Sequence, residues 1–169
     1  RRILELLWRQ HDDKLHKVAN IVGQTMQLHP HGDAAIYEAL VTLANKGYLL
    51  DRQGNFGNIF TGDSSAAARY IETRLSPLAR ETMFNPDITE TIPSYDGRNV
   101  EPVVLPAKIP LLLLQGASGI AVGMATQILP HNFTELLEAE IACIEGKKFK
   151  FFPDFPTGGI MDKSQYDKG

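Results

Sequence analysis

The run His29-Pro30-His31-Gly32-Asp33 constrains the fold because it separates two amphipathic stretches. Apolar residues recur at helical spacing on both sides of this run, at Leu15, Val18, Val22 and Met26 and then at Ile36, Leu40 and Leu43. Asp12 or Asp13 can cap a first helix over residues 14–27, and Gly47 ends the second. Pro30 suits the first position of a helix, where no N–H is needed. We therefore predict His29 as the N-cap and His31 in the first helical turn.

A change of pattern after Gly47 indicates a β-hairpin. The segments YLLD (48–51) and FGNIF (56–60) flank a turn that contains Gly54. A short amphipathic helix is expected over residues 3–9, upstream of the two helices. Three helices followed by a hairpin are the parts of a winged-helix domain, and the two helices with a short turn between them resemble a helix-turn-helix.

Arg69 and Tyr70 follow a stretch of small residues, 64–68. Ile71, Leu75 and Leu78 continue at helical spacing, so we predict a helix from about residue 61–63 to Phe84, with Tyr70 at its flank. A tyrosine is a weak nucleophile that needs a neighbouring cation or base, which Arg69 could supply. On this pair alone, a tyrosine that packs its ring against the core is the favoured interpretation.

The proline-rich stretch 85–110 reads as a loop and as a seam between domains. Beyond it, LLLLQ (111–115) and GIAVGM (119–124) are expected to be strands around a turn at 116–119, and Asn132 or Thr134 can cap a helix that ends near Ile144. The predicted class is α+β, with one domain over residues 1–105 and the beginning of another over 106–169.

Composition adds limits on function. The net charge is −3, yet residues 1–32 contain five Lys and Arg residues, three acidic residues and four of the five histidines, which favours a phosphate-facing patch. Cys143 is the single cysteine, so the chain has no internal disulfide and suits a reducing cytoplasm. The longest apolar run is too short to span a bilayer, so no membrane association is expected. The chain begins without Met, and we expect it to be part of a longer protein.

The spacing His29-x-His31-x-Asp33 resembles the start of a metallo-hydrolase motif. Ala34 follows Asp33 where that motif continues with a ligand, and only His131 comes later, so no two-metal cage can be filled. Asp12 and Asp13 are adjacent, so their side chains diverge on a helix. We predict no metal site on this chain, and the alternative for the histidines is simple capping of the helix start.

The candidate phosphate-handling residues are Arg1, Arg2, Lys17, His29, His31, Arg69 and Tyr70. Tyr70 attacking a phosphodiester would form a phosphotyrosyl bond, with Arg69 and His31 neutralising the charge that grows on the phosphorus. Departure of the 3′ oxygen normally needs a metal ion, so a partner would have to supply one.

Several long motifs in series resemble the breakage-reunion subunit of bacterial type IIA DNA topoisomerases, which is the A subunit of topoisomerase IV or DNA gyrase. They are HPHGDAAIYEAL (29–40), QGNFGN (53–58), GDSSAAARYIETRLSPLA (62–79), YDGRN (95–99) and LPAKIPLLLLQGASGIAVGMATQILPHN (105–132). The resemblance covers almost the whole chain in the right order.

The resemblance implies a winged-helix DNA-gate domain followed by the start of a tower domain. It implies that Tyr70 links covalently to DNA, that Arg69 stabilises the transition state and that Arg1 lies near the scissile phosphate. His29 and His31 would contact DNA, and Ile120 would wedge between base pairs.

The same resemblance implies a homodimer of this chain in an A2B2 heterotetramer acting on double-stranded DNA. The B subunit would bind both Mg²⁺ and ATP. Ala34 stands where the family usually has Ser, and with Glu38 it marks the contacts of quinolone drugs.

The sequences of the motifs resemble topoisomerase IV more closely than DNA gyrase. The A subunit of DNA gyrase remains the alternative. A non-catalytic winged-helix DNA-binding protein is a more distant one.

Overall fold

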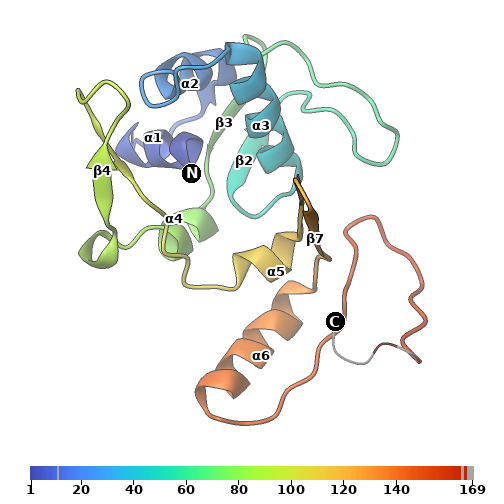
Figure 1. Cartoon of the computed structure of the whole chain (residues 1–169). Coiled ribbons are helices and arrows are strands. Elements are labelled where there is room, and N and C mark those ends of the chain that lie inside the picture. Colours follow the sequence, from blue (N-terminus) through green and yellow to red (C-terminus); the bar gives the residue numbers. More distant parts are fainter. Residues whose placement is uncertain (11, 165, 167–169) are drawn as a thin grey trace. The chain divides into compact units, whose positions relative to one another are not determined.

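The structure is a computed structural model that describes residues 1–10, 12–164 and 166 (Figure 1). The chain combines helices with small sheets whose strand pairs are all antiparallel in the described residues, which places the fold in the α+β class. The chain forms two compact units, Arg1–Ala107 and Lys108–Gly169.

Three helices form the first part of unit 1: α1 (Arg2–Gln10), α2 (Val18–Thr25) and α3 (Asp33–Asn45). Helix α2 contacts both α1 and α3. Their inward faces supply much of the core of the unit, with buried side chains at Leu4, Leu7, Val18, Ile21, Val22, Ile36 and Leu40. Burying an aliphatic side chain of this kind stabilises the fold by about 1.5–3 kcal/mol relative to leaving it exposed.

A small antiparallel sheet completes the core of unit 1. It contains β1 (His16–Lys17), β2 (Leu50–Gln53) and β3 (Glu72–Leu75) in the order β1-β3-β2. Leu50 pairs with Leu75 and Gln53 with Glu72, so the chain between β2 and β3 is a long connection. The partner predicted for YLLD, residues 56–60, is therefore wrong. Those residues form a tight loop instead, with a bridge between Asn58 and Asp63.

The helix predicted from residue 61–63 to Phe84 is also wrong. Ile71, Thr73 and Leu75 are all buried, which is the period-two pattern of a strand. A helix, α4 (Pro77–Met83), begins only after this strand, where the Ser76 hydroxyl accepts the Ala79 N–H at 3.0 Å.

The histidine run lies outside the helix that it was predicted to start. Helix α3 begins at Asp33 with Gly32 as its N-cap, so His29 is not the cap and His31 is not in the first turn. The chain turns after α2 because Leu28 is fully buried, and the Leu28 and His29 N–H groups both donate to the Thr25 carbonyl at 3.0 Å.

Helix α2 starts at Val18 rather than at residue 14, because residues 16–17 are paired with β3. Its N-cap is Lys17, so neither Asp12 nor Asp13 caps it.

The predicted loop 85–110 contains regular structure. A 3₁₀ turn (Pro86–Ile88) precedes an antiparallel pair, β4 (Thr91–Pro93) and β5 (Val100–Pro102). The turn between the strands is closed by Ser94, whose hydroxyl donates to the Asp96 carboxylate at 2.7 Å and accepts the Asn99 N–H at 3.0 Å.

Unit 2 contains α5 (Leu111–Gln115), the hairpin β6 (Ala117–Ala121) with β7 (Met124–Ile128), and α6 (Phe133–Ile144). LLLLQ was predicted as a strand but is helical, in keeping with the high helix propensity of leucine. The hairpin turns at Gly123, which has φ +79°, rather than at 116–119. Asn132 caps α6 as predicted, because its side-chain oxygen accepts the Thr134 and Glu135 N–H groups.

Two glycines in the loop between β2 and β3 provide a matched test of this backbone. Gly57 (φ +83°) and Gly62 (φ +78°) both have left-handed backbone conformations, but a Cβ at Gly57 would lie 2.5 Å from the Asp63 carbonyl oxygen, whereas a Cβ at Gly62 meets open space. Gly62→Ala should cost about 1 kcal/mol of unfolding free energy and Gly57→Ala clearly more, measured by urea unfolding. Equal losses for the two variants would contradict the close approach at Gly57.

Candidate nucleic-acid interface

Arg69 and Tyr70 lie together on an exposed turn of unit 1. The Tyr70 side chain is 64% exposed, and the Arg69 guanidinium carbon lies 4.6 Å from the centre of its ring. Two backbone hydrogen bonds join this turn to the N-terminus of α2. The Val18 N–H donates to the Ile71 carbonyl at 3.0 Å, and the Ala19 N–H donates to the Ala68 carbonyl at 3.1 Å. The backbone on both sides of Tyr70 is thereby fixed while the phenol faces solvent.

A tyrosine on α3 secures the chain that leads to this turn. The Tyr37 hydroxyl donates to the Ala66 carbonyl at 2.6 Å and lies 2.6 Å from the Ser65 hydroxyl. The Ala66 N–H in turn donates to the Asn55 carbonyl at 2.9 Å. The run of small residues before Arg69 is thus held in place by α3.

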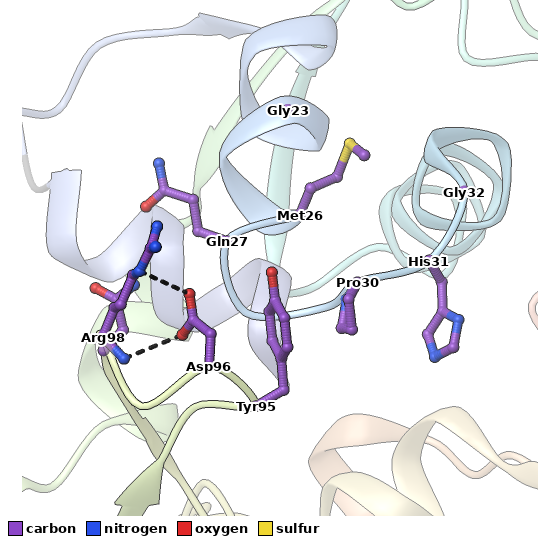
Figure 2. Close-up of a pocket in the computed structure, with 10 residues that line it drawn as sticks. Gly23, Met26, Gln27, Pro30, His31, Gly32, Tyr95, Asp96 and Arg98 are labelled. Atoms are coloured by element: carbon purple, nitrogen blue, oxygen red, sulfur yellow. Dashed lines mark hydrogen bonds and ion pairs between the residues drawn. The ribbon is translucent and has the colours of Figure 1, made fainter.

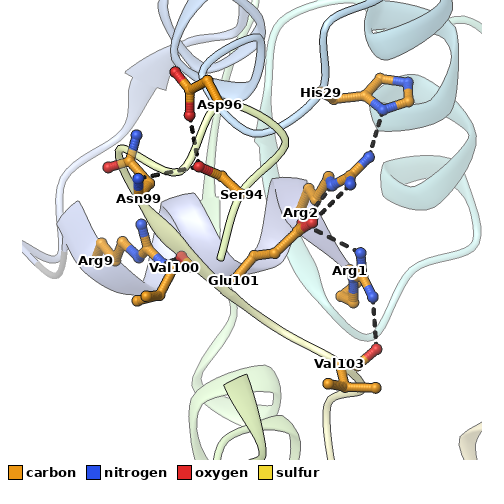
Figure 3. A network of polar contacts seen from close by, with 10 residues as sticks. All are labelled: Arg1, Arg2, Arg9, His29, Ser94, Asp96, Asn99, Val100, Glu101 and Val103. Carbon is orange, nitrogen blue, oxygen red and sulfur yellow. Dashed lines mark hydrogen bonds and ion pairs between the residues drawn. The ribbon is translucent and has the colours of Figure 1, made fainter. Parts of the chain in front are cut away.

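A second group of polar residues surrounds the carboxylate of Glu101 on β5 (Figure 3). This side chain is 4% exposed and pairs with two guanidinium groups. Arg2 forms a bidentate pair with it, from Nε to Oε2 at 2.5 Å and from Nη2 to Oε1 at 2.7 Å. Arg1 donates to Oε2 at 3.2 Å and to the Val103 carbonyl at 2.6 Å. The hydrogen bonds from Arg2 hold the pKa of the Glu101 carboxyl below its usual value.

The third donor of Arg2 reaches His29. The Arg2 Nη1 lies 2.6 Å from the His29 Nδ1 (Figure 3). His29 is half-buried, and its ring centre lies 4.5 Å from that of His31, which is exposed. Partial burial, the neighbouring His31 and the Arg2 charge together hold the pKa of His29 below its usual value.

An open hollow of about 1050 Å³ lies beside His31 (Figure 2). One wall comes from the end of α2 and the other from the turn between β4 and β5, where Asp96 pairs with Arg98 at 3.8 Å. Tyr95 from this turn faces Met26 and Pro30 in the view of Figure 2. The hollow brings the Tyr95 ring, the His31 imidazole and the Arg98–Asp96 ion pair to one surface, and aromatic and imidazole groups of this kind can stack on bases or donate to phosphates.

The predicted site residues form two clusters rather than one. The first, the Tyr70 cluster, consists of Arg69 and Tyr70 and lies at the beginning of α2. The second, the His29 cluster, consists of Arg1, Arg2, His29 and His31 and includes the residues that follow the end of α2. An eight-residue helix spans about 12 Å. Among the described residues, no hydrogen bond, ion pair or ring contact joins the clusters.

The remaining predicted residues belong to neither cluster. Lys17 pairs with Glu72 at 2.8 Å, in the part of unit 1 near Tyr70. Ala34 and Glu38 are exposed and one turn apart on α3. In unit 2, Ile120 is 90% exposed next to the tip of the β6–β7 hairpin, where Val122 is fully exposed. Met124, on the other side of the turn, is 74% exposed, so three apolar side chains gather near the tip of this hairpin, and a contiguous exposed apolar patch is typical of an interaction site.

The described part of the chain lacks two structural features. No helix there has the length and apolar character needed to cross a membrane. No group of three or more His, Cys, Asp or Glu side chains comes together there that could hold a metal ion.

Comparison with known proteins identifies the family. Residues 1–169 match the family of the A subunit of DNA gyrase/topoisomerase IV. The chain belongs to this family. It is 56% identical over 169 residues to the A subunit of DNA topoisomerase 4 from Borreliella burgdorferi, covering 100% of this chain and 27% of that protein.

Further relatives come from both enzymes. The chain is 48% identical over 174 residues to the A subunit of DNA gyrase from Kosmotoga olearia, covering 94% of this chain and 21% of that protein. It is 46% identical over 165 residues to the A subunit of DNA topoisomerase 4 from Rickettsia conorii, covering 88% and 22%. The chain thus spans about a quarter of the length of these relatives.

Two residues that hold the candidate site together were not predicted from the sequence of this member of the gyrase/topoisomerase IV family. Glu101 lies among apolar neighbours, Val100 to Val104, and an acid in such a strand needs a buried cation. That signal was present in the sequence, but its partners lie about a hundred residues away. Tyr37 carries no comparable signal, because its role depends on where the loop before Arg69 passes.

Replacing Glu101 by Gln tests the strength of this network in the topoisomerase fold. Because the side chains of the two arginines are 28–34% exposed, we expect the substitution to lower the free energy of unfolding at pH 7 by about 3 kcal/mol or less. The folded-state pKa is depressed, so the contribution is complete above the unfolded pKa near 4.3 and is lost as pH falls through the folded pKa. In urea unfolding, the difference in unfolding free energy between the unsubstituted protein and Glu101→Gln should be constant between pH 5 and 7 and should decrease below about pH 4.3. A gap that is unchanged at acid pH would contradict this assignment.

Proposed function

We propose that this chain is part of the breakage-reunion subunit of a type IIA DNA topoisomerase of the topoisomerase IV kind. It would cut both strands of a duplex, allow a second duplex to pass and reseal the first. The observation that carries the proposal is the exposed Tyr70 with the Arg69 guanidinium over its ring, on a turn fastened to α2, in a chain of this family.

The chemistry assigned to Tyr70 is a reversible transfer of a phosphoryl group. The phenolic oxygen attacks the phosphorus, an O–P bond to Tyr70 forms, and the bond from phosphorus to the 3′ oxygen breaks. The phenol proton passes to solvent or a base, and the 3′ oxygen leaves as a hydroxyl after gaining a proton. The 5′-phosphotyrosyl bond retains the energy of the broken linkage, so the reverse attack reseals the strand. Arg69 would neutralise charge that develops on the phosphoryl oxygens.

The fold supports a finer assignment. Helices α1 to α3 and the sheet β1-β3-β2 would form a winged-helix DNA-gate domain over residues 1–105, with α2 and α3 as its helix-turn-helix. Residues 106–169 would begin a tower domain, and Ile120 would insert between base pairs from the β6–β7 hairpin. The phosphate contacts would come from Arg1, Lys17, His29 and His31, and Arg2 would support them through its contact with His29.

Partners complete the proposed enzyme. Two copies of the full subunit would each supply one tyrosine, and a B subunit would bind Mg²⁺ and ATP in a cytoplasmic A2B2 assembly. Relatives named as DNA gyrase leave the gyrase form as the second candidate. A non-catalytic winged-helix DNA-binding protein is separated from both by the covalent test.

Tyr70→Phe in the full-length subunit should abolish covalent attachment to DNA, because the nucleophilic oxygen is removed. The measurement mixes the subunit with its B partner, Mg²⁺ and supercoiled DNA, stops the reaction with denaturant and detects protein-linked DNA. Tyr48→Phe, which removes the hydroxyl of another tyrosine, should still form the adduct. An adduct that survives Tyr70→Phe would refute the proposed nucleophile.

Ala34→Ser should raise the quinolone sensitivity of DNA cleavage, since the added hydroxyl on the exposed start of α3 can join a water-mediated contact near Glu38. The expected gain is about tenfold in drug concentration, equivalent to about 1.4 kcal/mol. The readout is the drug concentration that gives half-maximal cleaved DNA. Ala39→Ser, at another exposed position of α3, serves as the control and should leave sensitivity unchanged. Full sensitivity of the Ala34 protein would contradict the prediction.

A further inference from the structure

We infer that Glu101 is a positioning residue for phosphate binding, which fixes Arg2 so that Arg2 in turn presents the Nε2–H of His29 to an anion. The inference rests on the proposed function for the identity of that anion as a DNA phosphate. It concerns a residue that contacts no substrate itself, because its carboxylate is 4% exposed.

The bidentate geometry limits the movement of Arg2. Two of its nitrogens bind the two oxygens of Glu101, at 2.5 and 2.7 Å, so the planar guanidinium is fixed in both position and orientation (Figure 3). Its remaining nitrogen, Nη1, then has one direction available, and it reaches the His29 Nδ1 at 2.6 Å. A guanidinium without this carboxylate would keep its long side chain free to rotate.

The contact with Arg2 selects one form of His29. A guanidinium stays protonated in proteins and can only donate, so the His29 Nδ1 must accept. The neutral imidazole then carries its proton on Nε2, which is the tautomer that offers a donor on the side away from Arg2. The depressed pKa of His29 agrees with a neutral ring at physiological pH. His31, with its ring centre 4.5 Å away, adds an exposed neighbour to the same surface.

The charge balance of this group is compatible with phosphate binding even though it includes a carboxylate. Glu101 is matched by both Arg1 and Arg2, so the group retains one net positive charge with His29 neutral. Glu101→Gln raises that net charge by one unit. On charge alone the variant should bind DNA more tightly. A positioning role predicts the opposite, and the sign of the change separates the two explanations.

The test measures duplex affinity of the full-length subunit with its B partner, in the Tyr70→Phe background so that cleavage does not interfere. A fluorescent duplex is titrated at fixed salt with four proteins: the background, Glu101→Gln, His29→Ala and the double variant. We expect Glu101→Gln to weaken binding about tenfold, the size of one lost charge-assisted hydrogen bond. Added to His29→Ala, it should cost less than a further twofold, because Glu101 acts through His29.

Two controls keep the outcome clear. Glu5→Gln removes a carboxylate that pairs with Arg9 at 2.8 Å on the same helix as Arg2, and it should leave affinity unchanged. If Glu101→Gln fails to fold, Arg2→Lys keeps the charge but removes the bidentate geometry, and it should show the same loss and the same lack of additivity with His29→Ala. Both variants are checked for an intact unfolding transition.

Independent losses in the double variant, or tighter binding by Glu101→Gln, would overturn the inference. The adduct assay on the unsubstituted protein judges the proposed function separately. If the adduct forms normally but the losses of duplex affinity are additive, only the role of Glu101 is rejected and the proposed function stands. An absent adduct with non-additive losses would reject the cleavage chemistry while keeping the anion site.

Discussion

The beginning of helix α2 sets the geometry of the first unit. Val18 is fully buried, and its N–H belongs to the first turn of a helix, where no carbonyl of the same helix can accept it. The Ile71 carbonyl accepts it, and the Ala68 carbonyl accepts the next N–H. These two carbonyls lie on either side of Arg69 and Tyr70. A requirement of backbone hydrogen bonding therefore fixes the position of Arg69 and Tyr70, independently of any chemistry proposed for them.

The sequence was informative where one periodicity dominates a long segment. Helix α6 and its Asn132 cap were predictable, as was the existence of α1 and α3. It misled between Ile71 and Leu75, because a spacing of four residues fits both a helix turn and two periods of a strand. Thr73 decides between them, since it is fully buried and donates to the Asp51 carbonyl at 2.6 Å. A polar residue in that position conceals the alternation from a reading of hydrophobicity.

The candidate site shows the same division. Tyr70, Arg69 and the histidine run were singled out from residue types and a family resemblance, and their assigned roles stay predictions. Their separation at the two ends of α2 could not be foreseen, because it follows from the pairing of β3 with β1 and β2. Glu101 was missed for a related reason. Its importance depends on β5 contacting α1, a contact between segments about a hundred residues apart in sequence.

The long connection between β2 and β3 has a consequence for how this unit folds. Pairing Gln53 with Glu72 closes a loop over residues 54–71, and the entropy of that closure must be overcome before the strand contacts can form. The turn that carries Tyr70 lies at the C-terminal end of this loop, and its backbone is hydrogen-bonded to the first residues of α2, about fifty residues earlier in the sequence. An ordered Tyr70–Arg69 pair is therefore a property of the completed unit. No local segment, translated or folded alone, would display it.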